Sequence, residues 1–405
     1  MSLARPPRRV NCFGLAPFVP RLPATARPGE ASKVNCVGLA SLSARAGMGV
    51  GLPGLLAFGM NMPMSEGANT SGPATSTIVG IDEAGYGPLL GPLVVTAAAF
   101  DVPVEIMKRA RSDAEGPDLW QLLGGSVTRK VSKRDARLAV ADSKKLFQRG
   151  KGGEDLFALE RAVLTFMAQT DQAPTGWRGL LNMVAPFADE KLRHYPWYRD
   201  GDLNLPTCCR PDDLATQRNA LRADMAGQGI RFRGFWCEVL PEGHYNQLVN
   251  NTRNKAVVLF GLTTRLIQRV ADSVGPRPLR VWVDRQGGRV GYRRPLMTAF
   301  EDAQLDVLEE SPERSSYRLT RSTAPWVVRF VAKGEEHHLP IALASILSKY
   351  LRELFMMRFN SYWAAHVPDL RPTAGYYQDG QRFLTDIAPA ITRLKIDRQW
   401  LVRAL

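Results

Sequence analysis

Three acidic sites in this chain share one local pattern, because each follows a short apolar run and precedes a glycine or a polar turn. They are Asp82 with Glu83, Asp284 and Glu335. Nothing in the packing of a buried apolar strand requires a carboxylate at its end, yet three strand-like runs here lead to one. Adjacent strand ends would bring these carboxylates to one place, where their mutual repulsion requires a cation. Such a set of hard oxygen ligands favours Mg²⁺ or Mn²⁺.

The chemistry that such a cluster supports is in-line phosphodiester hydrolysis, with one metal ion activating water and a second stabilising the leaving oxygen. The chain has 53 Lys and Arg against 39 Asp and Glu, a net charge of +14, which indicates a polyanionic partner such as nucleic acid or an anionic surface. Acidic residues at strand ends are also common as solvated turn residues. The pattern alone leaves both interpretations open.

The elements that would position these acids alternate between strands and helices. Apolar and β-branched runs predict strands, and apolar residues at helical spacing predict helices. This alternation indicates an α/β or mixed α+β protein with a central sheet. The expected strands are 77–82, 93–100, 230–239, 279–284 and 326–333, and the expected helices are 154–169, 211–226, 245–273 and 339–363.

The chain divides by composition into a leader and a folded region. Residues 1–75 are rich in Pro, Gly, Ala and Arg, and we expect them to be disordered or not translated, with a weakly nucleic-acid-binding tail as the alternative. Residues 76–405 have the composition of a folded catalytic domain, with an insertion at about 150–230.

Cysteine content and hydropathy exclude two further classes of protein. The five cysteines form neither a C-x-x-C pair nor a zinc-type spacing, which argues against a disulfide scaffold and a structural zinc site. No run of eighteen apolar residues is present, so we expect no membrane span. We therefore expect a soluble, cytoplasmic monomer.

Five segments resemble, in order, the signatures of type 2 ribonucleases H, the family of bacterial ribonucleases HII and HIII. The first is I-D-E-A-G-Y-G-P-L-L-G-P at residues 81–92, and the second is A-D-S-K-K-L at 141–146. The others are V-W-V-D at 281–284, K-G-E at 333–335 and A-S-I-L-S-K-Y at 344–350. The resemblance extends over about residues 77–383.

This resemblance implies a ribonuclease H-like fold, a mixed five-stranded sheet flanked by helices. It implies endonucleolytic cleavage of the RNA strand of RNA/DNA hybrids, leaving 5′-phosphate and 3′-hydroxyl ends. The catalytic residues and metal ligands carry over as Asp82, Glu83, Asp284 and Glu335. The alternative is a non-catalytic hybrid-binding or interaction protein on the same fold, although an idle site need not keep all four acids.

The resemblance also implies substrate contacts, with departures from the family pattern. Gly85-Tyr86-Gly87 stands where ribonuclease HII has Gly-Arg-Gly, whose backbone contacts the ribose 2′-hydroxyl, and Tyr86 supplies no guanidinium. Glu335 replaces Asp and is similar to the HIII pattern, and Gln381 or a neighbour replaces the His that follows the Gly-Tyr segment. Substrate contacts are therefore expected at Gly85, Tyr86, Gly87, Ser143, Lys144, Lys349 and Tyr376. Whether the substrate is a long hybrid or a single embedded ribonucleotide stays open.

Overall fold

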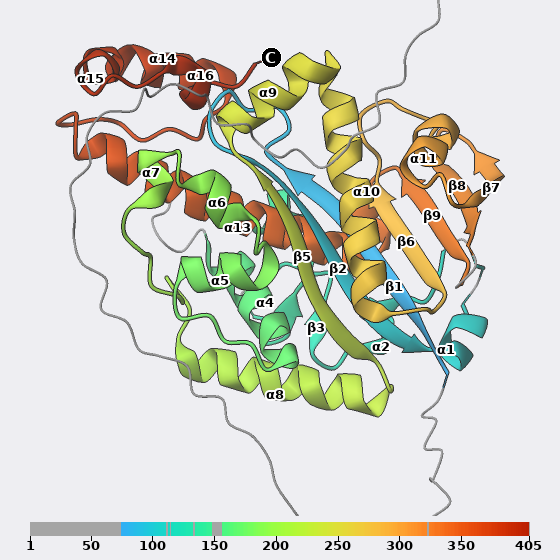
Figure 1. Ribbon diagram of the computed structural model, residues 1–405. Helices are drawn as coiled ribbons and strands as arrows, with labels where there is room; N and C mark the ends of the chain where they lie inside the picture. The colour runs from blue at the N-terminus through green and yellow to red at the C-terminus, as the bar shows by residue number, and fades with distance from the viewer. Residues whose placement is uncertain are drawn as a thin grey trace, which may run out of the picture. The chain divides into compact units, whose positions relative to one another are not determined.

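Strands from distant parts of the chain form one large mixed sheet in the computed structural model (Figure 1). The structure describes residues 74–404 except 111, 114, 133, 148–155, 322 and 323. The strands of this sheet are β1 (Thr75–Ala84), β2 (Leu93–Pro103), β5 (Arg231–Leu240), β6 (Leu279–Asp284), β7 (Gln304–Glu310), β8 (Arg314–Thr320) and β9 (Trp326–Val331). Their order is β5-β2-β1-β6-β9-β8-β7, and β3 (Val127–Thr128) pairs separately with β4 (Leu138–Ala139).

The central strands run in parallel, and this direction places the candidate acids. β1 pairs in parallel with β6, with Ile81 opposite Val283, and β6 pairs in parallel with β9, with Asp284 opposite Val331. The other neighbours are antiparallel. The carboxyl ends of β1, β6 and β9 therefore meet at one edge of the sheet.

The expected mixed sheet flanked by helices is confirmed, but its expected number of strands is wrong, because the described residues form a sheet of seven strands rather than five. All five strands expected from apolar runs are present as β1, β2, β5, β6 and β9. The additional strands are β7 and β8. β7 is mostly exposed and carries Asp306, Glu309 and Glu310, so it lacks the buried apolar pattern that marks a strand in a sequence.

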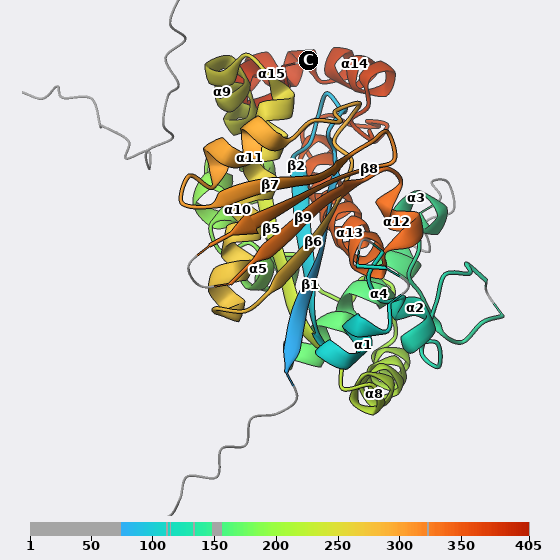
Figure 2. The same ribbon diagram turned by 90° about the vertical axis from the view of Figure 1, so that its right-hand side faces the viewer.

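Helices cover both faces of the central strands (Figure 2). The two long helices beside the sheet are α10 (Lys255–Val274) on one face and α13 (Leu339–Ala364) on the other. The remaining helices are α1 (Val104–Lys108), α2 (Leu119–Leu122), α3 (Ser143–Leu146), α4 (Phe157–Met167), η2 (Ala168–Thr170), α5 (Trp177–Val184), α6 (Ala188–Leu192), α7 (Pro196–Arg199), α8 (Pro211–Gly227), α9 (Glu242–Thr252), α11 (Arg293–Ala299), α12 (Gly334–His337), α14 (Tyr377–Asp386), α15 (Ala388–Arg393) and α16 (Arg398–Leu401). Among the described residues, no helix is both long and apolar enough to cross a membrane.

Helix α13 packs directly on β1 because Gly80 has no side chain. A Cβ atom on Gly80 would lie 2.1 Å from the backbone nitrogen of Ile341 and 2.1 Å from the carbonyl carbon of Pro340. The side chains of Ile341, Ala344 and Leu347 are fully buried. This close approach fixes the first turns of α13 against the strand that carries Asp82.

The single helix expected at 245–273 is wrong, because the structure has two helices there. α9 ends at Thr252, and Arg253 adopts a left-handed conformation with φ of 54°. Asn254 then caps α10, since its side-chain oxygen accepts from the amide of Ala256 at 2.9 Å. Asparagine is a strong N-cap residue, and the cap restarts the helix in a new direction.

The region expected as an insertion, about 150–230, contains α4 to α8, and residues 148–155 lie outside the described part. The expected leader, 1–75, also lies outside it except for Ala74 and Thr75, and Thr75 already begins β1. The insertion is tied to the core by the buried carboxylate of Glu160. This carboxylate accepts hydrogen bonds from the amides of Thr207, Cys208 and Cys209 at 2.6–2.8 Å, and from the Tyr350 hydroxyl at 2.7 Å.

The hydrogen bonds to Glu160 keep it ionised. Burial alone would raise its pKa, but the donors from Thr207, Cys208 and Tyr350 outweigh burial and lower the pKa to about 2. Cys208 and Cys209 place their sulfur atoms beside this carboxylate, a donor set of the kind that can hold a metal ion. Because both oxygens already accept bonds from protein donors, we interpret the cluster as a structural anchor.

We expect Glu160→Ala to destabilise the protein by at least about 3 kcal/mol, because the substitution leaves several buried donors without an acceptor. Chemical denaturation of the two proteins measures this difference. Glu105→Ala is the matched control, since Glu105 is an exposed residue paired with Lys108, and we expect no measurable change there. Equal stability of the Glu160 variant and the wild type would contradict the anchoring role.

Candidate metal-binding active site

Four carboxylates come together where β1, β6 and β9 end. Asp82 and Glu83 lie near the end of β1, Asp284 is the last residue of β6, and Glu335 lies in α12, just beyond β9. They are close enough for their charges to interact, since Glu335 affects the pKa of each of the other three. The structure thus brings together all four acids that were predicted from the sequence.

Burial and mutual repulsion disfavour the charged forms of these acids. Burial raises the pKa of Asp82 well above its usual value, and the charge of Glu83 adds to this effect. Burial and the charges of Asp284 and Glu335 raise the pKa of Glu83 to about 8. Burial and the charges of Asp82 and Glu335 raise the pKa of Asp284 to about 8. Carboxylates arranged in this way need a cation to remain ionised together at neutral pH.

Backbone amides orient two of the carboxylates. The amide of Glu83 donates to Oδ1 of Asp82 at 2.7 Å, and the amide of Gly334 donates to Oδ1 of Asp284 at 2.7 Å. A Cβ at Gly334 would lie 2.5 Å from Cδ1 of Ile341, so a side chain there would displace the end of the Ile341 side chain. Lys333, with φ of 52°, makes the turn that leads into α12. This local geometry carries Glu335 back toward the end of β6.

The residues present fit a divalent cation. Oε2 of Glu335 is buried without a hydrogen-bond partner among the described residues. A buried carboxylate oxygen without a partner is energetically unfavourable unless it contacts a cation or water. The donor set consists of carboxylate oxygens, the ligands that Mg²⁺ and Mn²⁺ prefer. Asp82, Glu83, Asp284 and Glu335 would hold such an ion.

Two serines of α13 support Asp82 and were not predicted as site residues. A side-chain hydrogen bond from Ser345 to Asp82 favours the carboxylate, and Oγ of Ser348 donates to the Asp82 carbonyl at 3.1 Å. Their spacing of three residues places both serines on one face of the helix. The A-S-I-L-S-K segment therefore contained a signal for these contacts.

The segment with Ser143 and Lys144 lies beside the acids. Ser143 is buried, and its hydroxyl oxygen lies 3.0 Å from that of Ser345. Ser143 therefore contacts the site through Ser345, which bonds to Asp82. Lys144 is exposed, and its positive charge offsets part of the rise in the pKa of Glu83. Of these two predicted substrate contacts, only Lys144 presents an exposed side chain.

Lys349 is paired within its own helix. Its ammonium lies 2.7 Å from Oε1 of Glu353, and both side chains are largely buried. The ammonium also lies 4.5 Å from the ring centre of Phe147. The structure therefore places Lys349 in an ion pair, and its predicted phosphate contact stays a prediction.

The Gly85-Tyr86-Gly87 segment leads away from the acids as a tight loop. Gly85 has φ of 86°, and a Cβ there would lie 2.5 Å from the Pro92 carbonyl oxygen. Gly87 is exposed, and a Cβ there would meet nothing within 4 Å. Tyr86 is half-buried, with the ammonium of Lys255 5.4 Å from its ring centre. A ligand can thus approach the backbone at Gly87 closely.

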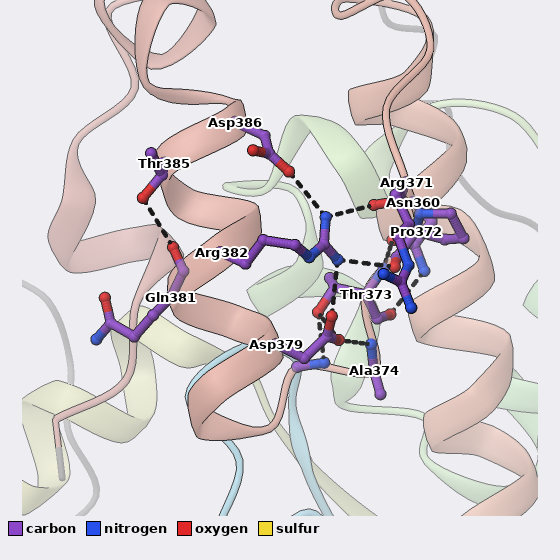
Figure 3. Close-up of polar contacts among 11 residues, drawn as sticks. Asn360, Arg371, Pro372, Thr373, Ala374, Asp379, Gln381, Arg382, Thr385 and Asp386 are labelled. Atoms are coloured by element: carbon purple, nitrogen blue, oxygen red, sulfur yellow. Dashed lines mark hydrogen bonds and ion pairs between the residues drawn. The ribbon is translucent and has the colours of Figure 1, made fainter.

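Tyr376 lies at the start of α14, on the wall of a surface cavity of about 560 Å³. Its side chain is half exposed, at 51%. Figure 3 shows how the preceding turn is held, with Asp379 accepting from the Thr373 hydroxyl at 2.6 Å and the Ala374 amide at 2.8 Å. Gln381, by contrast, is exposed, and its carbonyl accepts a bond from Thr385 within the helix.

Comparisons with known proteins return solved structures only, since no family model and no curated protein matches the chain. Bst-RNase HIII in complex with Mn²⁺ matches with 16% identity and a TM-score of 0.38, over 85% of this chain and 70% of that chain. A mutant of Bst-RNase HIII matches with 15% identity and a TM-score of 0.38, over 81% of this chain. That match spans 65% of the Bst-RNase HIII chain.

A third match is the RNase HII in the PCNA:RNase HII complex from Archaeoglobus fulgidus, with 13% identity and a TM-score of 0.34, over 80% of this chain and 93% of that chain. RNase HII and RNase HIII structures are thus among those that the comparison returns for this chain. At these TM-scores the likeness says nothing about activity. The site is defined by this chain's own residues.

We expect Asp284→Asn to raise the melting temperature of the metal-free protein by about 2 °C or more, because it removes one of the converging charges and keeps the oxygen that accepts from Gly334. The same variant should lose most of the rise in melting temperature that Mg²⁺ or Mn²⁺ gives the wild type. Thermal unfolding in EDTA and in each metal measures both effects. Asp306→Asn, on exposed β7, is the control, and an unchanged metal effect in Asp284→Asn would contradict the site.

Proposed function

We propose that this protein is a metal-dependent endoribonuclease that hydrolyses the RNA strand of RNA/DNA hybrids and leaves 5′-phosphate and 3′-hydroxyl ends. The observation that carries the proposal is the convergence of four carboxylates at adjoining strand ends, where one buried oxygen of Glu335 has no hydrogen-bond partner within the described part of the chain. The family resemblance of the five segments adds the substrate class. Net charge of +14 suits a polyanionic substrate.

In this proposal the four carboxylates hold two Mg²⁺ or Mn²⁺ ions. When bound, such ions activate water and stabilise the leaving oxygen of an in-line displacement. The chain's own contribution is placement. Backbone amides fix Asp82 and Asp284, and the short helix α12 returns Glu335 to the same edge.

The residues around the acids suit the rest of the substrate. Lys144 is exposed beside Glu83, and in this proposal it neutralises a phosphate. The backbone of residues 85–87 leaves room for a sugar at Gly87, and the half-exposed ring of Tyr376 can pack on a sugar or a base. Each of these three contacts is part of the proposal.

We expect Asp82→Asn to reduce the cleavage rate at least about 100-fold while hybrid binding is retained, because a metal ligand is lost but the nucleic-acid contacts remain. Cleavage of a labelled RNA/DNA hybrid in Mg²⁺ and in Mn²⁺ measures the rate, and a gel-shift assay measures binding. Asp306→Asn is the control and should cleave like the wild type.

A second duplex, DNA with a single ribonucleotide, separates the two forms of substrate. Cleavage of the hybrid alone would point to an HIII-like preference, and cleavage of both would show that Gly85 and Gly87 suffice for a single ribonucleotide. Undiminished cleavage by Asp82→Asn would contradict the proposed site. Binding without cleavage by the wild type would instead favour a non-catalytic hybrid-binding protein.

A further inference from the structure

The loop that follows the acids has its carbonyl groups held by two buried arginines. Arg352 of α13 donates to the carbonyls of Pro92 at 2.7 Å and Leu90 at 2.9 Å. Arg403, which follows α16, donates from Nη1 to the Gly85 carbonyl and from Nη2 to the Tyr86 carbonyl, the latter at 3.1 Å. A sequence separation of more than 300 residues lies between Arg403 and this loop. Nothing in the local sequence of either segment indicates the contact.

The bonds from Arg403 fix the direction of two successive peptide groups. In a trans peptide, the carbonyl of one residue and the amide N–H of the next point in opposite directions. With the Gly85 and Tyr86 carbonyls directed at the guanidinium, the N–H groups of Tyr86 and Gly87 point away from it. The planar guanidinium suits this task, since its fork can hold two acceptors at once.

Arg403 is itself held rigidly. Its side chain is only 3% exposed, and its guanidinium lies 4.0 Å from the ring centre of Tyr245. Its amide donates to the Leu89 carbonyl at 2.9 Å. Asn246 of α9 holds the chain on both sides, donating to the Val402 carbonyl at 2.7 Å and accepting from the Ala404 amide at 2.6 Å. These hydrogen bonds thus hold residues 402–404 in place beside the loop that contains Gly85 and Tyr86.

We propose that Arg403 is a positioning residue for sugar recognition. It orients the N–H groups of Tyr86 and Gly87 so that they meet a ribose hydroxyl of the nucleotide next to the carboxylate site. Tyr86 has no guanidinium of its own, and Arg403 supplies one to this loop from a distant segment of the chain. The inference rests on the proposed function, because the sugar must lie beside Glu83 for the loop to contact it.

The test compares the binding of an RNA/DNA hybrid with that of a DNA duplex of the same sequence, under metal-free conditions so that no cleavage occurs. We expect the wild type to prefer the hybrid and Arg403→Gln to lose that preference by on the order of 10-fold. Arg403→Lys should retain an intermediate preference, because an ammonium lacks the planar fork. Affinity for the DNA duplex should change little, since Arg403 touches no phosphate in this proposal.

The matched control is Arg393→Gln, which removes an exposed arginine whose bond is also to a backbone carbonyl, that of His366 at 2.8 Å. Its hybrid preference should equal that of the wild type. Melting temperature with and without Mn²⁺ checks the fold and the metal site, and a Mn²⁺-dependent rise retained in Arg403→Lys shows that the carboxylates are intact.

The outcomes separate the two proposals. A wild-type hybrid preference that survives in both Arg403 variants would overturn the positioning role and leave the proposed function standing. A wild type without any hybrid preference would overturn the proposed function, and the positioning role with it. A preference that is lost in Arg403→Gln, in a wild type that binds hybrid but does not cleave it, would support the positioning role and contradict the activity.

Discussion

Four carboxylates repel one another at one edge of the sheet, and the elements around them must hold them together against this repulsion. The parallel strands β1 and β6 bring Asp82, Glu83 and Asp284 to adjoining ends, and α12, just beyond β9, returns Glu335 to the same place. Burial, together with this repulsion, raises the pKa values of Asp82, Glu83 and Asp284. A fold that keeps such an arrangement must hold it against separation, and a divalent cation is the natural counter-charge.

Helix α13 and the glycines supply the rigidity that this arrangement needs. Gly80 allows α13 to lie directly on β1, which brings Ser345 and Ser348 against Asp82. Arg352, from the same helix, holds the far part of the following loop, and Arg403 holds the near part. The carboxylates and the loop beside them are therefore positioned by common elements.

Sequence patterns predicted the parts of this protein that depend on buried apolar residues. The five apolar strands and helix α13 follow from local apolar spacing, and the strand-end pattern predicted which acids would meet. Helix α8 was instead predicted from Pro211 and the Asp212-Asp213 pair in its first turn. β7 was missed because its side chains are mostly exposed and acidic, and the break before α10 was missed because it depends on a single left-handed residue, Arg253. No local sequence pattern could predict the hydrogen bond from Arg403 to the loop, because the two residues that it joins lie over 300 positions apart.

Anomalous scattering from crystals grown with Mn²⁺ tests whether the four carboxylates bind the metal ions of a nuclease site. We expect manganese peaks among Asp82, Glu83, Asp284 and Glu335, with carboxylate oxygens as ligands at metal–oxygen distances of about 2.0–2.4 Å. Manganese absent from this edge of the sheet, or bound instead at Glu160, Cys208 and Cys209, would contradict it.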